Sequence, residues 1–124
     1  MPTIKSVALS FVFATAGTLA AFAHGTMNAS VPRDGATVTA GLSEIEFSFT
    51  KPLRLTLVHV VRIPEQKKIR VTSELPKSFV KTAKLTVEVL PPGPYEVSWT
   101  AVADDGHVMS GSFKFSVRDA HPQQ

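Results

Sequence analysis

Two short segments, far apart in the chain, contain the residues best suited to chemistry. Ala21-Phe22-Ala23-His24-Gly25 lies near the start, and Asp105-Gly106-His107 lies near the other end. Each segment supplies an imidazole, and the second also supplies a carboxylate. Nitrogen and oxygen donors of this kind bind divalent transition metals. The two segments could therefore form one metal site, provided that the fold brings them together.

The position of His24 depends on how the N-terminus is processed. Lys5 precedes an uncharged stretch rich in Val, Ala, Leu and Phe. Ala21 and Ala23 then give the small-x-small pattern that signal peptidase recognises. We predict that residues 1–23 form a cleaved signal peptide, so that the mature chain begins at His24. The alternative is an uncleaved N-terminal anchor, but the apolar stretch is short for a spanning helix, which needs about 20 apolar residues.

Cleavage would give His24 two metal-binding nitrogens. Its freed α-amine and its imidazole Nδ1 can close a six-membered chelate ring around one ion. An α-amino group has an ordinary pKa of about 7.7–8.0, so a metal ion displaces its proton readily. A chelate at a chain terminus still needs further ligands from a rigid element.

Asp105 and His107 are suited to provide those ligands. Side chains at i and i+2 of an extended segment point to the same face, and Gly106 between them permits a tight bend. Together with the His24 amine and ring, they make three nitrogens and one oxygen. Such donors in a tetragonal plane fit Cu(II), which stands above Zn(II) in the Irving–Williams order. A tetrahedral Zn(II) site with the same ligands is the alternative.

The elements that must position these residues are predicted to be strands. Apolar residues alternate with polar ones over four short segments, a period of two that is typical of half-buried strands. A longer apolar strand is predicted over residues 55–63, with a return over residues 68–72, and residues 73–82 are predicted to form a loop. The alternating segments are residues 45–49, 85–89, 95–103 and 113–117.

Turn signals separate these strands, and no segment has a helical period. Ser30-Val31-Pro32-Arg33-Asp34-Gly35, Pro91-Pro92-Gly93-Pro94 and Asp104-Asp105-Gly106 each predict a turn. Short strands at this spacing predict an all-β domain, a small antiparallel Greek-key β-barrel or sandwich of Ig-like or cupredoxin-like type.

Composition limits the classes of protein to consider. The 124 residues include no cysteine, so thiolate ligands and disulfides are excluded, and the net charge of +3 comes from dispersed basic residues rather than a nucleic-acid-binding patch. Residues 24–124 are predicted to form one domain with a flexible tail from about residue 119. We expect a monomer. We also expect that the mature protein is not embedded in a membrane, because no segment after residue 23 is apolar enough to cross one.

Five motifs spread over the mature chain resemble those of a known family. They are the first residue His24, Ser30-Val31-Pro32-Arg33-Asp34-Gly35, Pro92-Gly93-Pro94-Tyr95-Glu96-Val97-Ser98-Trp99, Ala103-Asp104-Asp105-Gly106-His107 and Gly111-Ser112-Phe113-Lys114-Phe115-Ser116-Val117. The sequence resembles the CopC-type periplasmic copper-binding proteins, the copper resistance proteins of the CopC, PcoC and YobA group.

This resemblance implies a small Greek-key β-barrel in the periplasm. It implies that one Cu(II) per chain is bound by residues matching His24, Asp105 and His107. The implied function is that of a carrier or buffer in copper homeostasis and resistance, with an inner-membrane copper transporter of the CopD type as a partner.

The chain departs from the family pattern at two places. Some members hold Cu(I) in a Met-rich loop, but only Met27 and Met109 remain after cleavage, so no Met-rich Cu(I) site is expected. Both are expected to pack as partly buried apolar residues. Many members have an acidic residue before a proline at the end of the first long strand, where this chain has Lys51. A carboxylate that would orient a ligand imidazole is thus missing at this position.

The sequence contains two further histidines that could act as ligands, His59 and His121. His59 alternates with Leu57 and Val61 on an apolar strand, which predicts a core or rim histidine with one hydrogen bond. Its alternative role, as a Cu(I) ligand, lacks a supporting Met cluster. His121 lies in the polar tail and is expected to be exposed to solvent.

Two other functions fit parts of the pattern. A copper-dependent redox enzyme of the terminal-His type, such as a lytic polysaccharide monooxygenase, uses a second His in the copper plane. An anionic Asp105 would instead favour Cu(II) over Cu(I) and hinder redox cycling, so we expect no enzymatic activity. The second of these functions is that of a non-metal adhesion or interaction domain, since β-sandwiches carry many functions.

Overall fold

The structure, a computed structural model, describes residues 27–120. This part of the chain contains strands and no helix, so no helix in it could span a membrane. The predicted signal peptide, His24 and the end of the tail with His121 lie outside the described residues. The strands are β1 (Met27–Val31), β2 (Ala36–Thr39), β3 (Glu44–Arg62), β4 (Lys67–Ile69), β5 (Val80–Thr86), β6 (Gly93–Ala103) and β7 (Val108–Arg118).

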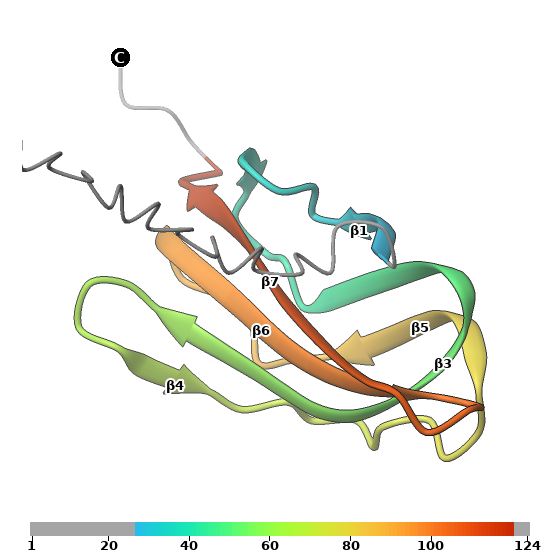
Figure 1. The fold of residues 1–124 in the computed structure, drawn as a ribbon. Helices are drawn as coiled ribbons and strands as arrows, with labels where there is room; N and C mark the ends of the chain where they lie inside the picture. The colour runs from blue at the N-terminus through green and yellow to red at the C-terminus, as the bar shows by residue number, and fades with distance from the viewer. Residues whose placement is uncertain (1–26, 121–124) are drawn as a thin grey trace, which may run out of the picture.

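All the strands belong to one sheet that curls on itself. Its order is β1-β3-β6-β7-β2, and β4 and β5 each pair with β3. In Figure 1 the first part of β3 and β5 lie on one side of the β6–β7 pair and the second half of β3 lies on the other, so that the sheet curls around a core like half of a barrel. The predicted all-β fold is confirmed. One pairing departs from the predicted antiparallel arrangement: β2 runs parallel to β7.

β3 is the central strand of the fold and changes partners halfway along. Its first half pairs with β1 on one edge and β5 on the other, whereas its second half pairs with β6. The sequence pattern predicts two strands here, but the structure has one. Pro52 lies where the register shifts between Ser48 and Leu53, a position where a residue without an N–H is tolerated.

The structure also differs from the sequence pattern in two whole strands, β1 and β2, and in the start of β5. β1 and β2 were not predicted, because each is short and its alternation is weak, and β2 is formed by pairing with β7. β5 begins at Val80, inside the segment predicted to be a loop. Short strands such as these depend on their partners more than on their own side chains.

The core lies inside the curled sheet and is rich in aromatic residues. Phe47 of β3 is fully buried and meets Phe113 of β7 edge-on, with ring centroids 5.7 Å apart. The ring centroids of Phe49 and Trp99 lie 5.6 Å apart, with the two rings tilted by 58°. Tyr95 and Trp99 belong to the core, as predicted, and the Tyr95 hydroxyl donates a hydrogen bond to the carbonyl oxygen of Pro91.

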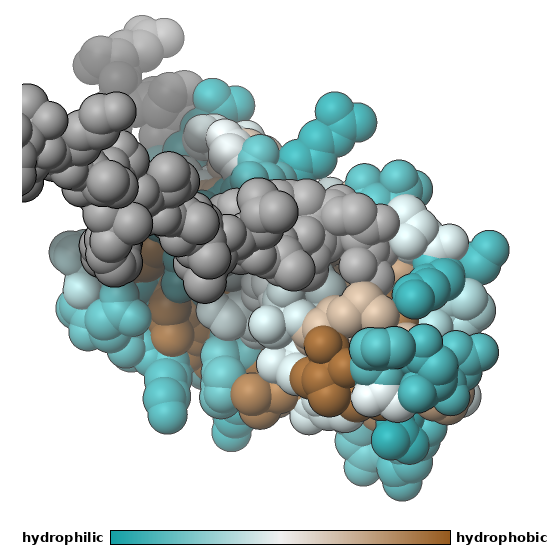
Figure 2. Space-filling model, viewed as in Figure 1, coloured by the Kyte–Doolittle hydropathy of each residue, from teal (hydrophilic) through white to brown (hydrophobic). Residues whose placement is uncertain are grey.

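The outer surface is mainly polar. In the view of Figure 2, exposed apolar side chains are interspersed with polar and charged ones. The large apolar residues that remain exposed are Val31, Leu57, Phe79, Val89 and Val108.

Candidate metal site

Asp105 and His107 lie on the turn that joins β6 to β7. The N–H of Gly106 donates to the carbonyl oxygen of Ala103 at 3.0 Å, and the N–H of Ala103 donates to the carbonyl oxygen of His107 at 2.9 Å. Gly106 has a φ of 88°, in the left-handed region that glycine adopts without a steric penalty. A turn at Asp104-Asp105-Gly106 is therefore confirmed, and it fixes the backbone on both sides of the candidate ligands.

The two predicted ligand side chains are in direct contact. Oδ2 of Asp105 lies 2.6 Å from Nδ1 of His107, and Oδ1 of Asp105 accepts a hydrogen bond from the backbone N–H of His107 at 3.1 Å. The exposed fractions of the two side chains are 52% and 78%, respectively. The pair is thus held together by the turn and open to solvent, and Nε2 of His107 has no partner among residues 27–120.

The hydrogen bonds from His107 keep Asp105 ionised. The backbone hydrogen bond lowers the pKa of the Asp105 carboxyl most, the side-chain hydrogen bond adds to this, and the charges of His107 and Lys51 add smaller effects. A group with a lowered pKa stays anionic as the pH falls, until the pH approaches that lowered value. Asp105 is therefore a carboxylate, the form that binds a cation, over the whole neutral range.

The start of β1 and the end of β6 meet along one edge of β3. Phe49 pairs with Met27, the first described residue, and Leu53 pairs with Ala103, the last residue of β6. On the other edge, β5 accompanies β3 past both positions, with Ala83 opposite Phe47 and Val80 opposite Leu53. β1 and β6 therefore follow each other end to end along β3, and the N-terminal end of β1 faces the end of β6 that leads into the Asp105–His107 turn.

Tether lengths agree with this topology, although His24 itself lies outside the described residues. The four residues from Phe49 to Leu53 span roughly 13 Å of strand. The three residues from Met27 back to His24 reach at most about 10 Å, and side chains add to that reach. Among the described residues, no group of three His, Cys, Asp or Glu side chains could hold a metal, so Asp105 and His107 would need a ligand from outside this range.

Comparison with known proteins identifies the family. The family model described as the CopC domain matches residues 27–118. The chain belongs to the CopC family. Among curated CopC relatives, Copper resistance protein C of Xanthomonas campestris pv. juglandis is 31% identical over 128 residues, covering 95% of this chain and all of that protein. Copper resistance protein C of Escherichia coli is 29% identical over 110 residues, covering 79% and 84% of the two chains.

Solved CopC-family structures share the fold. PcoC, a methionine-rich copper resistance protein from Escherichia coli, has a TM-score of 0.63 at 22% identity, covering 75% of this chain and 97% of PcoC. CopC from Methylosinus trichosporium OB3b has a TM-score of 0.66 at 17% identity, covering 82% of this chain and all of that one. At these identities the likeness concerns the fold alone.

His59 does not face the core. The pairs Leu55–Ala101 and Leu57–Thr100 leave Thr56 as an extra residue, and this bulge turns Leu57 and His59 outward. Of the two predicted positions for His59, core or rim, the core position is therefore wrong. A local bulge reverses the face of every later residue in a strand, and nothing in the alternation of the sequence marks it.

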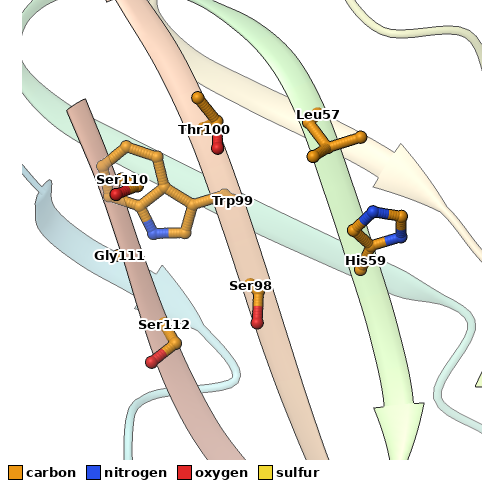
Figure 3. A pocket seen from close by; sticks show the side chains of 8 residues that line it. All are labelled: Leu57, His59, Ser98, Trp99, Thr100, Ser110, Gly111 and Ser112. Carbon is orange, nitrogen blue, oxygen red and sulfur yellow. The ribbon is translucent and has the colours of Figure 1, made fainter. Parts of the chain in front are cut away.

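The hollow beside His59 is separate from the Asp105–His107 turn. It has a volume of about 390 Å³, and Figure 3 shows His59 at one side, with Ser98 and Ser112 on the neighbouring strands. It offers hydroxyl groups and one imidazole, which is too few donors for a transition-metal site.

The two methionines lie against the core. Met27 pairs with Phe49 and Met109 pairs with Ala101, and both are half-buried and packed against the core. The prediction of partly buried apolar residues is confirmed.

Proposed function

We propose that this protein is a periplasmic Cu(II)-binding protein that acts as a carrier or buffer in copper homeostasis and resistance. The observation that carries the proposal is the Asp105–His107 pair, held on a turn toward which the start of β1 is directed. The mature chain would begin at His24, after removal of residues 1–23. Its partner would be an inner-membrane copper transporter, and the protein would act as a monomer.

The proposed ligands are the amine and imidazole of His24, the carboxylate of Asp105 and the imidazole of His107. When copper binds both turn residues, the 2.6 Å contact between Asp105 and His107 would give way to two bonds to the metal. Asp105 is already ionised, so it has no proton to lose before it binds the metal. One ion per chain follows from the single set of four donors.

The names of relatives support copper as the cargo. Two curated proteins of the family are called copper resistance proteins, and one of them matches this chain over its whole length. The donor set, three nitrogens and one carboxylate oxygen, suits Cu(II) better than Cu(I), which prefers sulfur ligands. Met27 and Met109 pack against the core, which argues against a Met-rich Cu(I) site.

A binding role fits this site better than redox catalysis. The anionic carboxylate of Asp105 stabilises the higher charge of Cu(II) and so disfavours cycling to Cu(I). The hollow beside His59, some distance along the sheet, is a shallow surface feature with no titratable group besides that imidazole. A protein that holds and transfers copper needs no substrate cleft.

The test is a Cu(II) titration of the mature protein beginning at His24, using a competing chelator of known affinity. One equivalent should bind, and EPR should detect nitrogen donors. A form with Gly-Ser before His24 should bind much more weakly, by more than the roughly 10–100-fold that loss of a supporting contact costs, because the amine becomes an amide. His59→Ala is the control and should bind like the wild type. Equal affinity of the two N-terminal forms would contradict the proposed ligands.

A further inference from the structure

Lys51 and Asp105 lie at the same end of the β3–β6 pair. Leu53 of β3 pairs with Ala103, the last residue of β6. Lys51 comes two residues before Leu53, and Asp105 comes two residues after Ala103, on the turn. Both side chains are exposed. The charge of Lys51 also makes a small contribution to the lowered pKa of Asp105.

Lys51 keeps this position without being tied to another acid. Among residues 27–120, no carboxylate lies within ion-pair distance of its Nζ, whereas Lys84 and Lys114 each contact a glutamate on a neighbouring strand. The side chain is therefore positioned to act on whatever Asp105 binds.

We propose that Lys51 is a tuning residue that weakens Cu(II) binding at the Asp105–His107 site and speeds copper release. This inference rests on the proposed function. The ammonium repels the incoming dication and competes with it for the Asp105 carboxylate. When copper leaves, the same ammonium stabilises the vacated carboxylate.

The size of the effect follows from the exposure of the site. In a dielectric close to that of water, the repulsion between a single charge and a dication several ångströms apart corresponds to roughly a 3- to 10-fold change in the dissociation constant. The Debye length is about 10 Å at 0.1 M salt and 3 Å at 1 M. Such an interaction is strong at low ionic strength and nearly absent at high ionic strength.

The sign of the charge at position 51 affects how tightly the site would bind Cu(II). A carboxylate at the position of Lys51 would add negative charge beside the metal and tighten binding, as in a protein that sequesters copper. An ammonium does the opposite. The protein would then bind Cu(II) with moderate affinity and exchange it quickly, which favours delivery to a partner over storage.

The experiment compares wild type, Lys51→Gln, Lys51→Arg and Lys51→Glu, each beginning at His24. Cu(II) dissociation constants are measured by chelator competition at 20 mM and 1 M salt, and release rates by stopped-flow mixing with excess chelator. At low salt Lys51→Gln should bind about 3- to 10-fold tighter and Lys51→Glu tighter still, with slower release. Lys51→Arg should match the wild type. At 1 M salt the differences should fall below about 2-fold.

Lys68→Gln is the matched control, because it makes the same charge change at the β3–β4 hairpin, at the other end of β3. It should leave the dissociation constant unchanged. The inference is overturned if the wild type binds copper and Lys51→Gln binds equally at low salt, or if the difference persists at 1 M salt. A wild-type protein that does not bind Cu(II) at all overturns the proposed function and this inference together.

Discussion

At the scale of single residues, the central contact is the one between Asp105 and His107. The carboxylate uses one oxygen for the backbone N–H of His107 and the other for the imidazole. These two bonds orient the imidazole and lower the pKa of Asp105. Orientation of an imidazole by a carboxylate increases its strength as a ligand. Asp105 therefore holds the His107 imidazole in an orientation that would suit a metal ligand.

The lowered pKa of Asp105 leads to a prediction about copper release in acid. A carboxyl with a lowered folded pKa keeps its charge as the pH falls and loses it only near that lowered value, below the ordinary 3.8. Between pH 7 and 5, Asp105 should therefore take up no proton when copper is released. Asp105→Asn should bind Cu(II) roughly 10- to 100-fold more weakly, with the same slope of log Kd against pH in this range. A slope smaller by one proton would show that Asp105 titrates there.

At the scale of elements, β6 and β7 form the rigid hairpin that carries the site. Trp99 of β6 pairs with Gly111 of β7 and is only 2% exposed. The Trp99 Nε1–H has no hydrogen-bond partner among the described residues, so packing alone holds the indole. Its ring also meets Phe49, whose β1 partner is Met27. The indole thus connects the hairpin with the strand that follows the chain start, and Figure 3 shows it lying across Gly111.

Gly111 is predicted to be intolerant of a larger residue. A Cβ at this position would lie 2.9 Å from Cζ2 of Trp99 and 3.0 Å from Cε2. Gly111→Ala should therefore displace the indole, lower the free energy of unfolding by about 1–3 kcal/mol and shift the tryptophan emission. Urea denaturation followed by fluorescence measures both. Ser110→Ala, at an exposed position on the same strand, is the control, and equal stability of the two variants would exclude the expected clash.

At the scale of the whole molecule, the strand order brings the start of β1 and the β6–β7 turn to the same part of the fold. β3 changes partners, and this places β1 and β6 end to end along one edge. Ligands from the chain start and from the last hairpin can then meet at one ion. A metal bound there would cross-link the first and last parts of the fold.

Copper should therefore stabilise the whole domain. At a free Cu(II) concentration 100 times the dissociation constant, binding to the folded state adds about 2.7 kcal/mol. For a domain of this size, that corresponds to a rise in Tm of roughly 10–20 °C. Differential scanning calorimetry of the mature protein measures the rise. His107→Ala should lose most of it and His59→Ala should keep it, whereas an equal rise in both variants would place the copper elsewhere.

The sequence alone predicts several strands and turns of this protein. The alternation of Tyr95, Val97 and Trp99 predicts strand β6 and its buried face, and Asp104-Asp105-Gly106 predicts the turn that joins Asp105 to His107. Side-chain periodicity and turn chemistry are local properties, so a short window of sequence contains them. The motifs were sufficient to point to the CopC family.

Only the tertiary structure decided which segments become neighbours. Three features depend on strand register: the continuity of β3 through Pro52, the bulge at Thr56 that turns His59 outward, and the position of Lys51 at the same end of the β3–β6 pair as Asp105. Register is set by backbone hydrogen bonds between segments distant in sequence, and a shift of one residue reverses the face of every side chain that follows. No local pattern records that choice, because the partner strand makes it.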